Sequence, residues 1–342
     1  MPNARKLPSG NYNCLVFSHY DYSTGKKKKI YESFTAPTAA EAEMAAAEWK
    51  ASRKNRGTDI TVAEAVERYI TAKTAVLSPS TIRGYRSYQR TAFDRIGAVR
   101  LRQLDAETVQ IWISFVSASH SPKTTRNIYG LLSSTLSMFM PGTAFSVALP
   151  AKRKQQYNLP PDEDIQKLLT YIRTYSGGAE LWIALCLAYY YGLRRGEICA
   201  LTDADLDGDI LTISKDVVMD ENKQWITKNI PKTADSFRSL RLSGAVLEAL
   251  KDIHGHFIAC NPDALLSRFK RALKASGIKP FNFHILRHCY ASRAAVMGVP
   301  DIYVAKMGGW KPGSPILKQV YQNALDAELL KQMDRMNELV PD

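Results

Sequence analysis

The sequence predicts a mainly α-helical chain with small β-sheets, an α+β fold, divided into three parts. Three observations support this prediction: helix-start signals recur along the chain, β-prone runs fall into two separate clusters, and one apolar run extends over residues 181–193. A membrane span needs about 20 apolar residues, so this shorter run predicts a buried helix. At 342 residues, the chain is long enough for two or three domains.

Residues 1–57 are predicted to form a small β-sheet followed by a helix. The runs 12–18 and 29–35 are β-prone, and the turn-rich segment between them predicts a hairpin. Thr38 and Glu41 have the spacing of a capping box, which predicts a helix over the Ala- and Glu-rich segment that follows. Because so small a sheet has little core of its own, we expect the helix to pack against it.

Residues 58–145 are predicted to be helical. Thr61 and Glu64 form a second capping box. Ser-Pro pairs at 78–79 and 121–122 each place an N-cap residue before a proline in the first helical position. These signals predict a small bundle of short helices.

Residues 162–342 form the largest part, after a linker at 146–161 that is rich in basic residues and proline. This part begins with two predicted helices and returns to helices at its end. Between them lie β-prone runs at 210–214, 224–230 and 236–242.

The composition points to a polyanionic partner. Lys and Arg number 46 against 33 Asp and Glu, so the net charge is +13 at pH 7, and the excess is spread over all parts of the chain. A protein this basic usually binds nucleic acid. A generally basic solvated surface is the alternative.

The cysteines and the N-terminal residues indicate a cytoplasmic protein. The five cysteines are scattered and include no C-x-x-C pair, which argues against a disulfide framework or a zinc site. The first residues lack the apolar stretch of a signal peptide.

Several basic side chains are candidates for contacts with DNA phosphates. On the helix predicted after Pro79, arginines recur at spacings of three and four and form one stripe. Others lie at the start of the helix after Ser121 and in the lysine run of the hairpin. For any one of them, a solvated surface residue is the alternative. The candidates are Arg83, Arg86, Arg90, Lys123, Arg126, Lys26, Lys27, Lys28 and Lys29.

The sequence lacks the common motifs of nucleotide and hydrolase chemistry. It has no P-loop, G-x-G-x-x-G, H-E-x-x-H or G-x-S-x-G, and no clustered carboxylates that would hold two metals near a phosphate. An enzyme of this sequence that acts on DNA would therefore hold the phosphate with cationic side chains and attack it with another side chain, without a metal.

Residues for that chemistry are present. Arg194 follows the predicted buried helix, and Glu197 is three residues away, where it can orient the arginine. Lys232 lies on a turn between two β-prone runs. His284 and Arg287 have the i, i+3 spacing that predicts one face of a helix.

Two further candidates lie near the end of the chain. Trp310 follows two glycines, and Tyr321 lies eleven residues later. Tyr303 is a rival nucleophile. Taken singly, these residues have ordinary explanations, such as a core position for Trp310 or a solvated hairpin for Lys232.

In this order, the residues resemble the tyrosine recombinases, also called phage-type integrases. Members of that family carry an arginine in G-L-R-x-x-E, a hairpin lysine, an H-x-x-R box, a His or Trp after a glycine, and a tyrosine nucleophile. The chain has G-L-R-R-G-E, H-I-L-R and G-G-W in the matching order, and its R-H-C-Y-A-S is similar to the family's R-H-T-x-A-S.

The chain departs from the family pattern at three places. Trp310 stands where His is more common, the segment from Trp310 to Tyr321 is lengthened at Pro312-Gly313, and Asn323 stands where the family often has His.

The resemblance implies a site-specific DNA recombinase that integrates and excises a mobile element, from a phage or a conjugative transposon. The implied reaction cleaves and rejoins DNA through a 3′-phosphotyrosine intermediate and a Holliday junction, without metal, ATP or another cofactor. It implies that Tyr321 is the nucleophile, that Arg194 and Arg287 bind the phosphate, and that His284 handles a proton. Lys232 would be the general acid, Trp310 a donor to the phosphate, and Glu197 the partner of Arg194.

The resemblance also assigns roles to the parts. Residues 1–57 resemble an arm-type DNA-binding module, residues 58–145 a helical, SAM-like core-binding domain, and residues 162–342 the catalytic domain with a C-terminal helix. The implied partner is double-stranded DNA with core-type and arm-type sites, bound by a homotetramer in the bacterial cytosol. A monomer in solution, a directionality factor and a DNA-bending protein are open options, and no membrane is implied. The helix at 324–339 could dock on a neighbouring subunit or on its own core.

Three alternatives stay open at this point. A type IB topoisomerase or a chromosome-dimer resolvase would share the chemistry, but the N-terminal module argues against both. An inactive DNA-binding protein of the same fold would not need the complete set of site residues. An RNA-binding or ribosomal factor would explain the charge but not the ordered motifs.

Overall fold

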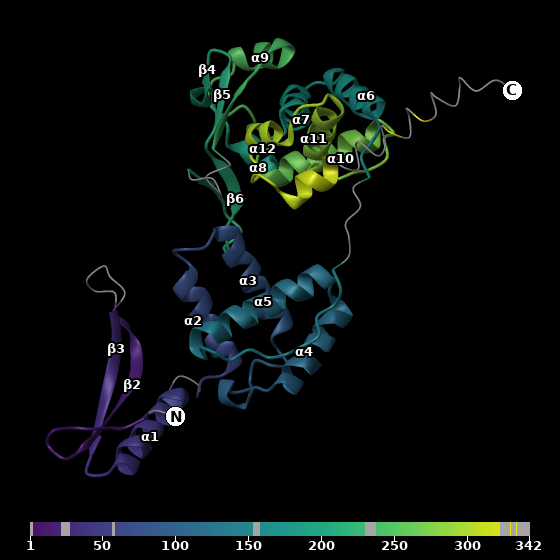
Figure 1. Cartoon of the computed structure of the whole chain (residues 1–342). Coiled ribbons are helices and arrows are strands. Elements are labelled where there is room, and N and C mark those ends of the chain that lie inside the picture. Colours follow the sequence, from purple (N-terminus) through teal and green to yellow (C-terminus); the bar gives the residue numbers. More distant parts are fainter. Residues whose placement is uncertain are drawn as a thin grey trace. The chain divides into compact units, whose positions relative to one another are not determined.

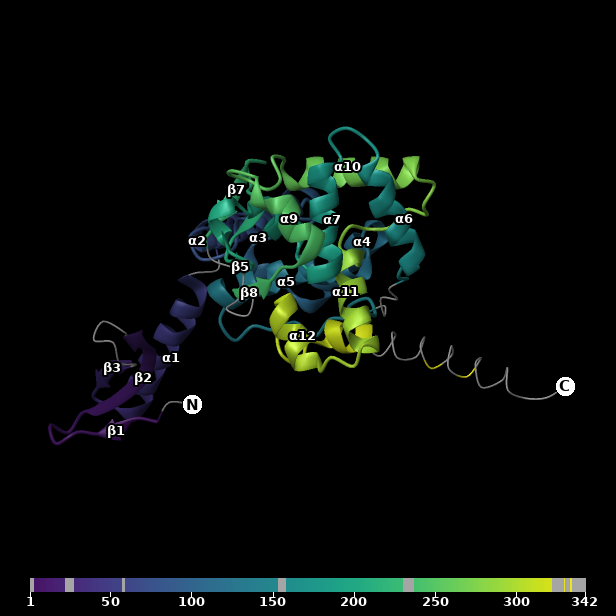
Figure 2. The same cartoon turned by 90° about the horizontal axis from the view of Figure 1, so that it is seen from above.

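The protein is described here as a computed structural model (Figures 1 and 2), in which the chain divides into two compact units, residues 1–77 with 84–153 and residues 78–83 with 154–342. Helices with small antiparallel sheets make up both units, so the predicted fold class is confirmed. The structure describes residues 3–21, 28–56, 59–152, 158–229, 237–321, 329 and 333.

The N-terminal residues form a sheet with one helix along it (Figure 1). The strands pair antiparallel in the order β1-β2-β3. The capping box of Thr38 and Glu41 is present in both directions, and a small core of Cys14, Val16 and Ala42 closes between sheet and helix. The predicted hairpin and packing helix are therefore confirmed. The elements are β1 (Arg5–Lys6), β2 (Tyr12–Asp21), β3 (Lys28–Ala36) and α1 (Ala39–Arg56).

The next residues form a helical bundle, as the capping signals predict. Thr61 and Glu64 form the second capping box, and the Ser121 side chain accepts a hydrogen bond from the backbone N–H of Thr124. Ile70 and Leu131 are fully buried in its core. The elements are α2 (Val62–Lys73), α3 (Pro79–Ala92), the 3-10 helix η1 (Leu101–Gln103), α4 (Ala106–Ser119) and α5 (Pro122–Phe139).

The remaining part is built around one apolar helix. Residues 181–189 of α7 are all buried, and α6, α9, α10 and α11 contact it (Figure 2). In the described part of the chain, no helix is long and apolar enough to cross a membrane. The helices are α6 (Asp162–Arg173), α7 (Ala179–Tyr191), α8 (Arg195–Ala200), the 3-10 helix η2 (Asp203–Asp205), α9 (Gly244–Lys251), α10 (Pro262–Ala275), α11 (Ile285–Val296) and α12 (Asp301–Gly308).

Two small antiparallel sheets lie beside these helices. One has the order β4-β5-β8, and the other is the hairpin β6-β7. The three predicted runs correspond to β5, β7 and β8, whereas β4 and β6 were not predicted. The predicted helix at 324–339 falls almost entirely outside the described residues. The strands are β4 (Leu206–Asp207), β5 (Ile210–Ile213), β6 (Asp216–Met219), β7 (Trp225–Lys228) and β8 (Arg238–Arg241).

Candidate active site

Arg194 lies at the N-cap of α8, directly after the buried helix α7. Helix α7 ends because Gly192 takes the left-handed conformation, with φ of +71°, and a Cβ there would lie 2.6 Å from the ring of Tyr290. Arg194 is therefore held by rigid structure. Its side chain remains 33% exposed, so a ligand can still reach it.

Glu197 orients Arg194 as the spacing predicts. The backbone N–H of Arg194 donates to Glu197 Oε2 at 2.9 Å, and Arg194 Nη1 donates to Oε1 at 2.5 Å. The other end of the guanidinium, Nη2, donates to the carbonyl of Gly309 at 2.6 Å. Both ends of the fork are therefore fixed.

Arg287 is one of the most deeply buried side chains of the described residues, with 1% of its surface exposed. Its Nη1 donates to the carbonyls of Gly192 and Gly308, and its guanidinium carbon lies 3.6 Å from the centroid of the Trp310 ring. Its Nε and Nη2 have no hydrogen-bond partner among the residues that the structure describes. A buried cation with two unpaired donors is costly unless an anion completes its contacts.

Residues 308–310, here called the glycine turn, join the two arginines. The carbonyl of Gly308 accepts from Arg287, and that of Gly309 accepts from Arg194. A Cβ on Gly308 would lie 1.9 Å from the Trp310 ring, so only glycine fits under that ring. The Trp310 ring also stacks on Tyr290, with 6.4 Å between centroids and 5° between planes.

His284 lies at the N-cap of α11 with helical backbone angles, and its carbonyl accepts a hydrogen bond from the backbone N–H of Arg287 at 3.2 Å, so the two residues keep the predicted i, i+3 relation. The helix begins only at Ile285, and the backbone N–H of His284 donates to Asn282 Oδ1 at 2.9 Å, outside the helical pattern. The His284 ring meets that of His288 edge to face, with 5.0 Å between centroids.

Both histidines are neutral at pH 7. Desolvation lowers the pKa of His284 to about 4, with further contributions from His288, Arg287 and Arg194. Burial and then Arg287 lower the pKa of the buried His288 to about 4 as well.

We expect an NMR titration of the imidazoles in DNA-free protein to show apparent pKa values near 4 for this pair, with His284→Gln used for assignment. Because these values lie below the ordinary 6.5, the unfolded chain takes up the protons first as pH falls. The free energy of unfolding should therefore decrease from pH 6.5 towards pH 4. Titration of the His284 and His288 rings at 6.5 or above would contradict this expectation.

Tyr321 packs on the cluster that contains Trp310, Leu317 and Val320. Its hydroxyl donates to the carbonyl of Val299 at 2.9 Å. Burial, and then Asp301 and Tyr290, raise the pKa of Tyr321 to about 12, so the phenol is protonated.

Arg238 is a further residue of the site, and the sequence did not predict it. It is 5% exposed and pairs with Glu197, with Nη2 at 2.9 Å from Oε2. Burial by itself would raise the pKa of Glu197, but Arg238 and then Arg194 outweigh it and lower that pKa to about 2. A signal was available, because Arg238 falls in the inward register of β8 with Leu240.

Comparison with known proteins identifies the family of one part of the chain. Residues 160–328 match the model of the phage integrase family. This stretch therefore forms a domain of that family. The family resemblance drawn from the motif order is thus confirmed.

Two sequence relatives of this chain illustrate the match. A tyrosine recombinase XerC-like protein of Caldanaerobacter subterraneus subsp. tengcongensis is 24% identical over 213 residues, which are 52% of this chain and 53% of that protein. The integrase of Salmonella phage P22 is 46% identical over 43 residues, 13% of this chain and 11% of that protein. The chain thus spans about half the length of the first relative and a ninth of the second.

Solved structures share the fold of this chain. The Tn1549 transposon integrase in complex with transposon right end DNA has a TM-score of 0.63 at 16% identity, over 80% of this chain and 99% of that one. A lambda integrase dimer bound to a COC′ core site has a TM-score of 0.57 at 18% identity, over 94% and 95%. A lambda integrase tetramer bound to a Holliday junction gives 0.56 at 17% identity, over 93% and 94%.

The side chains predicted to contact DNA lie in different surroundings. Arg83, Arg90 and Lys123 are exposed. Arg86 instead pairs with Glu67. Arg126 Nε donates to the carbonyl of Pro150 at 2.9 Å. Both of these arginines thus have partners within the protein.

The structure describes only some of the other predicted residues. Lys29 is exposed on β3, while Lys28 begins that strand. Lys232, Lys26 and Lys27 lie outside the described residues.

Tyr303, the rival nucleophile, is 60% exposed on α12. It borders a hollow of about 630 Å³ between β8 and α12, which Arg238 and Trp310 also line. Within the described ranges, no group of three or more His, Cys, Asp or Glu residues could hold a metal ion.

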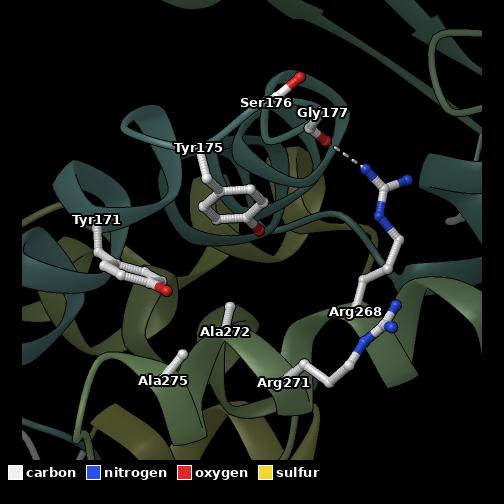
Figure 3. Close-up of a pocket in the computed structure, with 8 residues that line it drawn as sticks. All are labelled: Tyr171, Tyr175, Ser176, Gly177, Arg268, Arg271, Ala272 and Ala275. Atoms are coloured by element: carbon white, nitrogen blue, oxygen red, sulfur yellow. Dashed lines mark hydrogen bonds between the residues drawn. The ribbon is translucent and has the colours of Figure 1, made fainter.

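A second hollow of about 370 Å³ lies between α6 and α10 (Figure 3). Tyr171 and Tyr175 lie on one side of it and Arg268 and Arg271 on the other. Arg268 is already engaged, because it donates to the carbonyl of Gly177 at 2.8 Å and pairs with a glutamate of α7. None of the predicted site residues lines this hollow.

Proposed function

We propose that this recombinase is an integrase that cleaves and rejoins DNA through a 3′-phosphotyrosine link to Tyr321, and that strands exchange through a Holliday junction to integrate and excise a mobile element. The observation that carries the proposal is Arg287, a buried guanidinium with two unpaired donors close to the partly exposed guanidinium of Arg194. A buried cation is costly unless an anion completes its contacts, and a DNA phosphate is such an anion.

In the proposed reaction, both arginines stabilise the transition state. Negative charge spreads over the non-bridging oxygens during phosphoryl transfer, and two planar forks match that geometry in a way that lysine does not. The Trp310 side chain packs against Arg287 and adds an indole N–H that can donate to a phosphate oxygen.

The proton steps are assigned to His284 and Lys232. The Tyr321 oxygen attacks the phosphorus, the P–O5′ bond breaks, and a 3′-phosphotyrosine and a free 5′-hydroxyl result. The neutral imidazole of His284 accepts the phenol proton, and Lys232 gives a proton to the leaving 5′-oxygen. Rejoining is the reverse, and because the covalent link keeps the phosphodiester energy, the scheme uses neither ATP nor metal.

Tyr321 must leave its present hydrogen bond for this attack. Its hydroxyl donates to Val299, and its pKa of about 12 disfavours the phenolate. We infer that DNA binding moves the tyrosine towards the arginines, where positive charge lowers that pKa.

The partner assignments are proposals of the same kind. Residues 58–145 would bind core-type DNA and residues 1–57 arm-type DNA, which gives avidity across two sites on one chain. The lambda integrase structures on a core site and as a tetramer on a Holliday junction support a homotetramer as the working assembly. A directionality factor, a DNA-bending protein and action in the bacterial cytosol stay predictions.

The test of the function uses nicked suicide duplexes built from both ends of the DNA element around the gene. With EDTA present, the wild-type protein should give a covalent protein–DNA band on a denaturing gel. Salt-sensitive binding to several candidate ends without any adduct would favour an inactive DNA-binding protein. Relaxation of any supercoiled plasmid, regardless of sequence, would favour a topoisomerase.

The basic stripe of α3 gives a separate prediction about binding. We expect Arg83→Ala and Arg90→Ala each to reduce the slope of log affinity against log salt by about one, because each removes one phosphate contact. Arg86→Ala should change the slope less, since Arg86 is paired with Glu67. The measurement is core-site binding by fluorescence anisotropy over a salt series. A larger change for Arg86→Ala than for the other two would contradict this assignment.

A further inference from the structure

Arg238 uses its whole guanidinium inside the protein. It is the first residue of β8, and its side chain is 3% exposed. Nη2 donates to Glu197 Oε2 at 2.9 Å, Nη1 donates to Oε1 at 3.3 Å, and Nε donates to the carbonyl of Met307 at 2.7 Å. One side chain thus joins β8, α8 and the end of α12.

The first of these contacts acts on Arg194. Glu197 is a buried carboxylate that binds Arg238 and Arg194 with the same two oxygens. Without Arg238, Glu197 would keep one counter-charge and lose the fork that fixes the plane of its carboxylate. The carboxylate that holds Arg194 would then keep only its contacts with Arg194 itself.

The second contact acts on the glycine turn. Met307 directly precedes this turn, whose two carbonyls accept hydrogen bonds from Arg287 and Arg194. The bond from Arg238 Nε therefore fixes the backbone immediately before the groups that hold both phosphate-binding arginines. Lysine could not replace it, because a point charge cannot serve a carboxylate and a carbonyl in one plane.

We propose that Arg238 is a positioning residue of the active site, which sets Arg194 through Glu197 and sets Arg287 through the glycine turn. The catalytic consequence rests on the proposed function, but the linkage between β8, α8 and α12 does not. Arg238 touches no reacting atom in this scheme.

The matched control is Arg241, on the same strand. Its side chain is 76% exposed and pairs with Asp209 on the surface, at 2.9 Å. Arg238→Met and Arg238→Lys are compared with Arg241→Met in the full-length protein. Three measurements are made on each: the rate of adduct formation on a nicked suicide duplex, the affinity for the same duplex, and hydrogen exchange of the backbone amides by mass spectrometry.

We expect Arg238→Met to lower the adduct rate about 100-fold, the effect of a small misplacement of catalytic groups, with affinity nearly unchanged. Exchange should rise in segments 194–201 and 307–310 but not in the helix α10. Arg238→Lys should recover part of the rate, because it restores the charge beside Glu197. Arg241→Met should match the wild type, as expected for an exposed ion pair.

The outcomes separate the two proposals. An Arg238→Met adduct rate within threefold of wild type would overturn the positioning role. So would exchange that rises uniformly over residues 160–321, which would show a general loss of stability. If the wild type forms no adduct on any duplex, the proposed function fails. The exchange data alone then decide whether Arg238 links β8, α8 and α12. Faster exchange in the two named segments then supports the linkage, and unchanged exchange overturns it.

Discussion

Tyr321→Phe is expected to abolish the covalent protein–DNA adduct while core-site binding is retained. The substitution removes only the hydroxyl, so the ring keeps its packing beside Trp310 and Val320. A nucleophile has no substitute in this scheme, and we expect the rate of adduct formation to fall at least about 1,000-fold. The measurement is the band on a denaturing gel against time, together with anisotropy for binding.

Tyr303→Phe serves as the control for this variant. Tyr303 is exposed on α12 and is not part of the cluster that holds Tyr321. We expect it to form adduct at the wild-type rate. An adduct that persists in Tyr321→Phe and disappears in Tyr303→Phe would show that the nucleophile has been assigned to the wrong tyrosine.

Arg287→Lys is expected to have the second largest effect. Lysine keeps the charge but not the fork, so it cannot bind Gly192, Gly308 and a phosphate oxygen together. Loss of one donor to a developing oxyanion costs about 2.7–4 kcal/mol, so we expect the adduct rate to fall about 100- to 1,000-fold. Single-turnover cleavage of the suicide duplex measures this rate.

The matched control is Arg293→Lys on the same helix. The Arg293 guanidinium lies over the Tyr189 ring, 4.6 Å from its centroid, and contacts none of the site residues named above. We expect a loss of stability smaller than about 1 kcal/mol and an unchanged adduct rate. Thermal unfolding of both variants shows whether Arg287→Lys acts on the reaction or on folding. An adduct rate for Arg287→Lys within threefold of wild type would contradict its phosphate-binding role.

Local signals predicted much of the fold. The capping boxes at Thr38 and Thr61 mark helix starts that the structure contains, because a cap satisfies backbone donors within four residues of sequence. Strand β6 was missed, since the four residues Asp216–Met219 give too short a pattern, and their pairing with β7 depends on the turn between them.

Only part of the candidate site was predicted, because the sequence indicates contacts between neighbouring residues but not contacts between distant ones. The contact between Arg194 and Glu197 spans three residues and follows from their spacing. The contacts of Arg238 with Glu197 and Met307 span 41 and 69 residues, and only the folded chain brings them together. The neutral state of His284 depends on its surroundings in space, which the H-x-x-R spacing does not contain.

The contacts that the glycine turn makes with Arg194 and Arg287 can form only after nearly all of this part of the chain has been synthesised. Arg194 is held by the carbonyl of residue 309, which lies 115 positions further along the chain. Arg287 is held by the carbonyl of residue 308, which lies 21 positions further along. A ribosome adds residues one at a time, and domains fold as they emerge. A nascent chain that has exposed Arg194 but not this turn therefore lacks the carbonyl that fixes one end of its guanidinium.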